Sequence, residues 1–306
     1  MPIAYYTSEA HFSHNTDADH PEHAMRIMAI EQALKQTGFW NELEHHEGKK
    51  ADLTDIKRAH SEGYIEQLHL IQPDHGQILV DEDTAMTPGS LEAALWSAGA
   101  CALALDNTSS STGQHAFVAT RPPGHHAEHR KAMGFCFFNN IAITALRAAD
   151  VHHYQRIAIL DFDAHQGNGT IDILGNDKRF LLCSSFQHPF YPYSHYEQAK
   201  FNNVINVPLC EGTGSATFRA LIEEHWLPKL KAYAPEIILV SAGFDAHKDD
   251  PMAELSLIED DYLWLGRQVR ELASKRNTPS ISILEGGYNL NTLGASVAAY
   301  LRGLSD

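Results

Sequence analysis

The chain has 306 residues, of which 43% are hydrophobic, and its 39 acidic and 23 basic residues give a formal net charge of −16. This length and composition allow one large hydrophobic core or two small ones. The negative charge argues against a nucleic-acid-binding surface, which requires basic patches, and no apolar stretch approaches the roughly 20 residues that a membrane-spanning helix needs.

In the first third of the chain, the apolar pattern predicts a strand at residues 3–7 and a helix at 21–34. A second, nearly all-apolar helix is expected at residues 90–105, with Ser90 as its N-cap. The polar run 106–114 that follows is short, so we interpret it as a connection and not as a domain boundary.

From residue 115 onward, β-branched apolar runs alternate with helical patterns. Strands are predicted at residues 115–119, 156–161, 180–185, 204–208, 236–242 and 280–284. Helices are predicted at residues 140–149, 216–232, 260–274 and 293–304. This alternation predicts a single α/β domain over residues 1–306, built on an open, mostly parallel β-sheet of about eight strands flanked by helices.

The cysteines and the amino end bear on the cellular compartment. Cys101, Cys136, Cys183 and Cys210 form no CxxC pair, and Cys136 and Cys183 lie in apolar runs, as buried reduced thiols do. Residues 1–6 lack a basic segment followed by a long apolar one, so no signal peptide is indicated. We therefore expect a protein of the reducing cytoplasm.

Two similar segments, DFDAH at 161–165 and GFDAH at 243–247, each follow an apolar run that predicts a buried parallel strand. In open α/β sheets, ligands bind at the carboxyl ends of the strands. Asp163 and His165 are two residues apart, so on an extended segment their side chains point the same way, and Asp245 supplies a third ligand. Such a pair alone is more often a structural ion pair or a cap. Its recurrence after a second strand predicts a catalytic zinc site with an open position.

Polar residues in two further turns are suited to chemistry beside such a metal. The tandem His125 and His126, in a proline turn, are placed to flank a metal-bound water, one taking its proton and the other holding positive charge. Asp161 and Asn168 are the candidates to fix their tautomers. Tyr288, carried on two glycines after a strand, can bring its hydroxyl to a developing oxyanion. Without the metal motif, two surface histidines and a packed aromatic would be the simpler interpretation.

Five sequence blocks, in this order, resemble those of a known enzyme family. They are ATRPPGHHAE at 119–128, MGFCFFNN at 133–140, LDFDAHQGNGT at 160–170, SAGFDAH at 241–247 with DPM at 250–252, and LEGGYN at 284–289. They resemble the arginase–deacetylase superfamily, and within it the class II histone-deacetylase-like enzymes. The resemblance covers most of the chain and implies the arginase–deacetylase fold.

The resemblance assigns a role to each candidate. It implies zinc held by Asp163, His165 and Asp245. It implies His126 as general base and then general acid, His125 as its electrostatic partner, and Tyr288 as the group that polarises the amide carbonyl. Asp161 would orient His125, and Asn168 would orient His126.

The resemblance also implies structural potassium and a set of substrate contacts. One potassium site would involve Asp161, Asp163, His165, Ser184 and Ser185. A second would fall near Leu174, Asp177 and Phe180. Substrate contacts would come from Asp83, Gly134, Phe135, Tyr191 and Met252. Among these, Phe135 and Tyr191 would form the aromatic walls of an acyl-lysine tunnel, and Asp83 would accept the substrate's backbone amide.

The chain departs from the family pattern at some points. Gln166 stands where many relatives have a histidine, and segment 21–26, which contains His23, differs at contacts expected for acetate exit. Polyamine-specific relatives place an acidic residue near the tunnel rim. In the matching stretch this chain has Met252, which cannot pair with a distant ammonium group.

These observations predict a zinc-dependent hydrolase that converts N-ε-acetyl-lysine, in a protein or peptide, to lysine and acetate. An acetylpolyamine amidohydrolase is the second choice. A binuclear-manganese, arginase-like ureohydrolase is disfavoured, because Gln166, Ala246 and His247 stand where further carboxylates would be needed. An acyl-lysine binder without catalysis is disfavoured by Tyr288. The expected partner is an acylated substrate, with neither nucleic acid nor a membrane, and the sequence does not indicate an oligomeric state.

Overall fold

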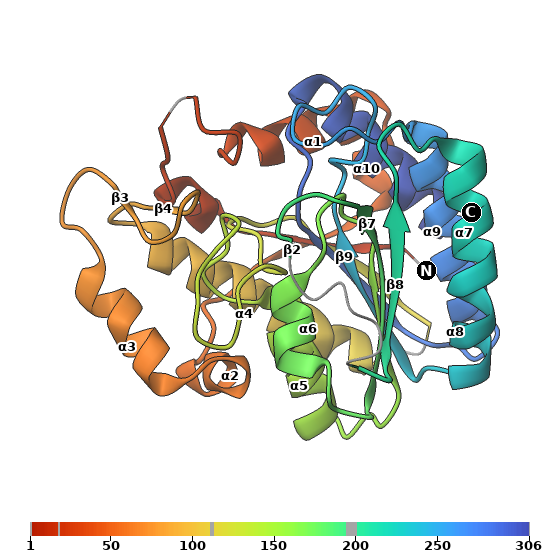
Figure 1. The fold of residues 1–306 in the computed structure, drawn as a ribbon, viewed down its shortest axis with the longest axis horizontal. Helices are drawn as coiled ribbons and strands as arrows, with labels where there is room; N and C mark the ends of the chain where they lie inside the picture. The colour runs from red at the N-terminus through yellow and green to blue at the C-terminus, as the bar shows by residue number, and fades with distance from the viewer. Residues whose placement is uncertain (1, 18, 111–112, 194–200, 306) are drawn as a thin grey trace.

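The computed structural model describes residues 2–17, 19–110, 113–193 and 201–305. Within these residues its central sheet has eight strands, and every pairing of neighbours is parallel (Figure 1). The strand order is β2 (Glu44–Glu47), β1 (Ala4–Thr7), β5 (His115–Val118), β10 (Ser280–Leu284), β9 (Ile237–Ala242), β6 (Ile157–Asp161), β7 (Phe180–Gln187) and β8 (Val204–Leu209). The chain is therefore a single α/β domain on a parallel sheet, as the sequence predicts.

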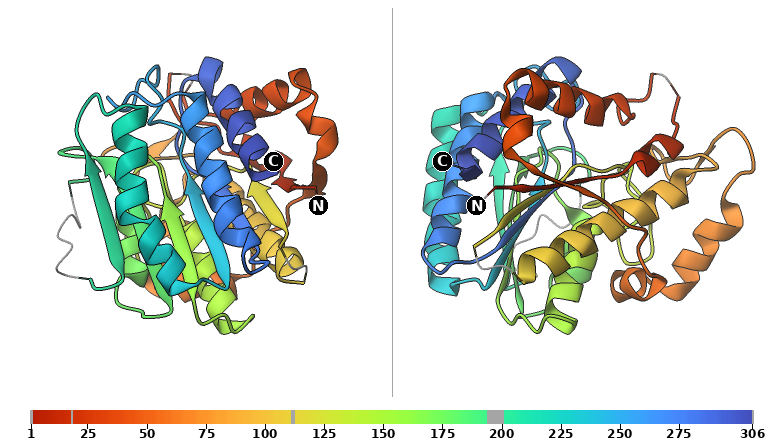
Figure 2. Two further views of the ribbon diagram at one scale, coloured as in Figure 1. Left: turned by 90° about the vertical axis from the view of Figure 1, so that its right-hand side faces the viewer. Right: turned by 180° about the vertical axis from the view of Figure 1, so that it is seen from behind.

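Helices cover both faces of this sheet. On one face lie α4 (Ser90–Ser109), α5 (Asn140–Asp150) and α6 (Asn168–Leu174), with α2 (Leu53–Ala59) and α3 (Glu62–Ile71) beside them. On the other lie α1 (Met25–Gln36), α7 (Ser215–His225), α8 (Leu227–Tyr233), α9 (Glu259–Ser274) and α10 (Leu290–Ser305), and the left view of Figure 2 shows several of these in front of the strands. None of the helices in the described part of the chain is both long and apolar enough to cross a membrane.

Each face of the sheet has its own hydrophobic core, and successive strand residues contribute to alternate cores. In β5, Ala116 and Val118 belong to the core under α4 and α5, whereas Phe117 belongs to the core under α1 and α10. Side chains of a strand alternate between faces, so burial on both faces requires a continuous apolar run. This is why the central strands could be recognised in the sequence.

The amino-terminal helices differ from the predictions at their ends. Helix α1 begins at Met25 and not at residue 21. The prediction of Ser90 as an N-cap is wrong: Gly89 precedes the first residue of α4, and Ser90 Oγ accepts the backbone N–H of Thr87 at 2.7 Å. Helix α4 also continues to Ser109, so the first part of the predicted connection is helical.

The predicted helix 216–232 is two helices, α7 and α8, which meet at Trp226. Pro228 lies in the first turn of α8, where a residue without a backbone N–H is tolerated. Inside one continuous helix, Pro228 could not donate the backbone hydrogen bond that its position would require. Strand β2 was not predicted, because its sequence EHHE has no apolar alternation and its residues are largely exposed at the edge of the sheet. The short antiparallel pair β3 (Ile78–Leu79) and β4 (Ala85–Met86) was also missed.

Candidate active site

Strands β6 and β9 are neighbours in the sheet, so the loops that follow them start side by side. Asp163 and His165 lie in the loop after β6, and Asp245 lies in the loop after β9. The candidate ligand atoms of these three buried residues all lie within 4.8 Å of one another. His165 Nδ1 is 3.1 Å from Asp163 Oδ1 and 3.0 Å from Asp245 Oδ2. The structure thus brings together the three residues predicted as metal ligands.

The chemistry of this group fits a divalent metal. His165 Nε2 donates to the carbonyl of Met252 at 3.1 Å, so in the neutral ring the lone pair is on Nδ1, facing the two carboxylates. Burial opposes a charge on this ring, yet Asp245 and Asp163 raise the pKa of His165 well above its usual value, so this location favours positive charge. Two carboxylates and one imidazole are donors typical of an open zinc site.

A backbone N–H group from a neighbouring loop holds each of the two carboxylates in place. The N–H of Gly286 donates to Asp163 Oδ2, and the N–H of Ala164 donates to Asp245 Oδ1, both at 2.8 Å. At Gly286 a Cβ would overlap both carboxylates, and at Gly243 it would overlap that of Asp163. The glycines of SAGFDAH and LEGGYN therefore provide room for the acidic pair. Within the described residues these three side chains form the one group of His, Cys, Asp and Glu suited to hold a metal ion.

The two adjacent histidines have different hydrogen-bond partners and different charge. His125 Nδ1 donates to Asp161 Oδ2 at 3.1 Å, and His126 Nδ1 donates to Asn168 Oδ1 at 2.7 Å. Burial opposes protonation of His125, but the carboxylates of Asp163 and Asp161 raise its pKa to about 10. Burial and the positive charge of His125 hold the pKa of His126 well below its usual value. The surroundings therefore favour a positive charge on His125 and a neutral ring for His126.

The turn that carries these histidines is anchored at both ends. The carboxylate oxygen Oε2 of Glu285 accepts the backbone N–H groups of Gly124 at 2.7 Å and His125 at 3.1 Å. Burial raises the pKa of Glu285 to about 7. At the other end, the guanidinium of Arg121 forms a fully buried ion pair with Glu22. Sequence reasoning gave Glu285 and Glu22 no role. The Gly124 and His125 partners of Glu285 are backbone N–H groups, which leave no signal in a motif, and the Arg121 partner of Glu22 lies 99 residues away in the sequence.

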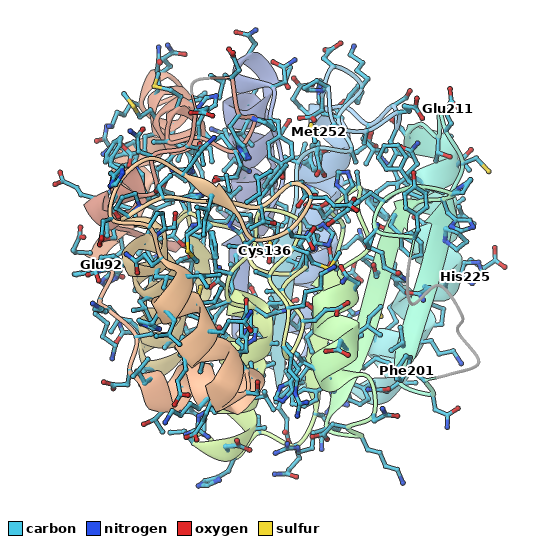
Figure 3. The ribbon with its side chains drawn as sticks, turned by 60° about the vertical axis from the view of Figure 1, so that its left-hand side comes forward. Glu92, Cys136, Phe201, Glu211, His225 and Met252 are labelled. Atoms are coloured by element: carbon cyan, nitrogen blue, oxygen red, sulfur yellow. The ribbon has the colours of Figure 1, made fainter. Side chains whose placement is uncertain are left out.

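A pocket of about 220 Å³ opens beside the metal ligands. It is lined by Asp83, His126, Gly134, Phe135, His165, Phe190, Tyr191, Met252 and Tyr288. All five predicted substrate contacts are in this set, and Met252 is labelled toward the top of Figure 3. Phe190, whose ring centroid is 5.5 Å from that of His165, was missed, although it directly precedes the predicted Tyr191.

Tyr288 lies between an aromatic ring and a buried cation. The Phe135 ring is edge-on at 5.9 Å, and the Arg26 guanidinium lies 4.8 Å from the Tyr288 ring centroid. Arg26 Nε donates to the carbonyl of Gly287 at 2.6 Å. The enclosed position raises the pKa of the Tyr288 hydroxyl well above its usual value, so it remains a hydrogen-bond donor. Arg26 was also missed, but it shares the i, i+4 stripe of Ile30 and Leu34, where a charged residue is unusual.

A hydrogen bond between Asp83 and Gly134 joins two segments that line the pocket. Asp83 Oδ1 accepts the N–H of Gly134 and the hydroxyl of Thr84, both at 3.0 Å, so one of its oxygens is used within the chain. Gly134 has φ +57°, and a Cβ there would overlap the ring of His126.

The two predicted potassium sites differ in their surroundings. Ser184 pairs with Asp161 across β6 and β7, and the buried hydroxyls of Ser184 and Ser185 have no hydrogen-bond partner. The second predicted site would involve the carbonyls of Leu174, Asp177 and Phe180. These three oxygens do converge, but on the side-chain amide of Asn203, which lies 3.1–3.2 Å from each.

Similarity to known proteins agrees with this geometry. A model of the histone deacetylase domain matches residues 20–304. The chain is 36% identical to the chloroplastic histone deacetylase 10 of Oryza sativa subsp. japonica, over 98% of this chain and 72% of that protein. It is 34% identical to a histone deacetylase-like amidohydrolase of Pseudomonas aeruginosa, over 89% of this chain and 72% of that protein. The crystal structure of the HDA15 HD domain matches with a TM-score of 0.89 and 28% identity, covering 99% of this chain and 88% of that one.

Proposed function

The chain belongs to the histone deacetylase family, and from this premise we propose that it is a zinc-dependent hydrolase of N-ε-acetyl-lysine in proteins or peptides. Deacetylase activity follows from the family; the metal, the substrate and the residue roles are our proposal. One observation supports it above all. Asp163, His165 and Asp245 converge beside a pocket that also presents the neutral His126 and the hydroxyl-bearing Tyr288.

We assign the zinc to Asp163, His165 and Asp245. When bound, zinc acts as a Lewis acid on a carbonyl and lowers the pKa of a water molecule towards about 7. The chain supplies the rest of the chemistry. The Nδ1–H bond to Asn168 leaves the Nε2 of His126 with a lone pair, so His126 can take a proton from water at Nε2 and later return it to the leaving amine.

His125 and Tyr288 stabilise charge during this sequence. His125, protonated and bonded to Asp161, places a positive charge next to His126, with ring centroids 4.0 Å apart. Burial, together with this charge, lowers the pKa of His126 and so favours its neutral form before the reaction. Tyr288 donates its hydroxyl proton as a hydrogen bond to the carbonyl oxygen as negative charge develops there.

The pocket favours an extended, mostly apolar side chain. Phe135, Phe190 and Met252 supply apolar wall, and such a wall suits the methylenes of acyl-lysine. An acetylpolyamine is the second candidate, because the carboxylate of Asp83 also lines the pocket and is the wall group able to meet an ammonium. We retain Asp83 as the proposed acceptor for a backbone amide of the peptide.

We further propose a structural potassium ion near Asp161, Ser184 and Ser185. Two buried hydroxyls without partners are unusual in a protein interior and are supporting observations for a ligand there. We limit this proposal to the first site, because Asn203 already donates to the carbonyls of the second.

The test combines metal analysis with a comparison of substrates. Purified protein loaded with zinc should hold one equivalent, lose activity on an acetyl-lysine peptide when chelated, and regain it with zinc. The Asp245→Ala variant should lose both metal and turnover. The ratio of kcat/KM for the peptide and for an acetylated polyamine then decides the substrate. Two manganese ions per chain, or full activity of Asp245→Ala, would overturn the proposal.

A further inference from the structure

Asp250 has a buried carboxylate that takes no part in the proposed metal site or proton transfers. Only 7% of this residue is exposed. Its Oδ2 accepts two consecutive backbone N–H groups, from Tyr288 at 2.6 Å and from Asn289 at 3.0 Å. Its Oδ1 accepts the N–H of Met252 at 3.0 Å. One carboxylate thus binds three backbone donors, and two of these belong to the pocket-lining residues Met252 and Tyr288.

These bonds connect two loops that both contribute to the site. Asp250 is in the loop after β9, which also carries Asp245, and Tyr288 is in the loop after β10. Strands β9 and β10 are paired, so the loops leave the same edge of the sheet. A shift of the Asp250 carboxylate would therefore move the backbone of Tyr288 relative to the metal ligands.

Two glycines, which restrict the backbone less than other residues do, come directly before Tyr288. Gly286 and Gly287 precede it, and Gly287 has φ +116°, a conformation that glycine adopts readily. External contacts must therefore fix the tyrosine. Arg26 contacts the ring and the Gly287 carbonyl, and Phe135 contacts the ring edge. Asp250 is the group that holds the N–H of Tyr288 itself.

We propose that Asp250 is a positioning residue, which fixes the hydroxyl of Tyr288 against the reacting carbonyl by binding the Tyr288 backbone. The inference rests on the proposed function, because it gives Asp250 a role only if Tyr288 acts as a donor. Hydrogen bonds to an ionised carboxylate are about twice as strong as neutral ones, which suits this anchor. A misplacement of about 1 Å at a reacting group can cost on the order of 10²-fold in rate.

Two variants and a matched control test this role. Asp250→Ala removes all three bonds and should lower kcat by about 10- to 100-fold, with KM changed less than about threefold and with bound zinc unchanged. Asp250→Asn keeps one acceptor oxygen for Tyr288 but turns an NH₂ group toward the N–H of Met252, so its loss should be smaller. Asp249→Ala removes the neighbouring carboxylate, whose side chain is 54% exposed, and should match the wild type.

The decisive measurement introduces Asp250→Ala into the Tyr288→Phe variant. The rate is measured under single-turnover conditions, which detect residual activity. Phenylalanine keeps the backbone N–H but has no hydroxyl to position. If Asp250 acts through that hydroxyl, adding Asp250→Ala to Tyr288→Phe should change the rate by less than about twofold. An equal fold-loss in both backgrounds would overturn the inference.

The outcomes for Asp250 and for the proposed function are distinct. An inactive wild type, or a fully active Tyr288→Phe, would refute the proposed function itself. An active wild type with an impaired Tyr288→Phe and an unimpaired Asp250→Ala would refute only the positioning role. If Asp250→Ala does not fold, Asp250→Asn carries the same comparison, because it is nearly isosteric with the native residue.

Discussion

Gly134 shows how a residue without a side chain can determine the geometry of His126, the proposed general base. Its φ of +57° and the His126 ring beside it leave no room for a Cβ. Gly134→Ala should therefore displace His126 and lower kcat by about 10²-fold, since proton transfer requires a positioned base. Gly212→Ala is the control, because Gly212 also has positive φ (+73°) but nothing within 4 Å of its would-be Cβ. Equal activity of the two variants would contradict this account.

Tyr288 gives a second prediction for a single residue. Tyr288→Phe removes the proposed oxyanion donor while leaving the backbone bonds to Asp250 in place. We expect kcat to fall by about 10²–10³-fold on an acetyl-lysine peptide, with zinc content unchanged. Steady-state kinetics together with metal analysis checks both parts. A variant that lost zinc as well would show that the ring acts through the metal site and not through its hydroxyl.

The site residues that could be predicted are charged side chains at positions of the sequence where apolar residues are usual. Asp163, His165 and Asp245 stand out because charged groups follow apolar strands, and the structure brings them within reach of one ion. Asp250 lies in the same segment, in DPM, but two of its three partners are backbone N–H groups of a loop 38 and 39 residues away. Any residue except proline can offer such a group, so the pairing cannot be read from residue types.

At the scale of elements, Glu285 joins three parts of the fold that are distant in sequence. Its Oε2 binds the turn of Gly124 and His125 after β5, and its Oε1 accepts the hydroxyl of Ser241 in β9 at 3.1 Å. Glu285→Ala would leave three buried donors without an acceptor. Each unsatisfied buried group costs about 1–3 kcal/mol.

We therefore expect Glu285→Ala to lower the free energy of unfolding by about 3 kcal/mol or more and to reduce kcat through the displaced histidine turn. Glu285→Gln, which keeps an acceptor oxygen, should lose much less. Ser241→Ala removes only one of the three bonds and serves as the comparison. Urea unfolding monitored by circular dichroism gives the stabilities. An alanine variant as stable as the wild type would show that water replaces the carboxylate.

The elements themselves were predictable where burial dictates composition. Strands β6, β9 and β10 are apolar on both faces because helices cover both, and their ends agree with the prediction to within a residue. Strand β2 is held by backbone pairing to β1 along its length. Its polar sequence EHHE has no apolar pattern from which this pairing could be predicted. The division between α7 and α8 follows from Pro228, but the run on either side is amphipathic enough to suggest one helix.

At the scale of the whole molecule, buried neutral histidines link folding to pH. His60 is 1% exposed; its Nδ1 donates to the Glu128 carbonyl at 3.0 Å, and its Nε2 accepts the N–H of Asn139 at 2.9 Å. Protonation would break the second bond and place a charge in the core. Burial accordingly lowers the pKa of His60 to about 4, and burial lowers that of His115 to about the same value.

The sign of the effect follows from proton uptake. Between about pH 6.5 and pH 4 the unfolded chain binds a proton at His60 that the folded chain does not, so stability is full above this window and is lost as the pH falls through it. From pH 7 to pH 5, His60 alone should lower the free energy of unfolding by about 2 kcal/mol.

His60→Gln should be less stable than the wild type at pH 7. Between pH 7 and pH 5, however, it should lose about 2 kcal/mol less stability than the wild type loses. The exposed His75→Gln is the control, with the wild-type slope. Urea unfolding at pH 5, 6 and 7 measures this, and parallel curves for His60→Gln and wild type would show that the ring has the same pKa in the folded and the unfolded chain.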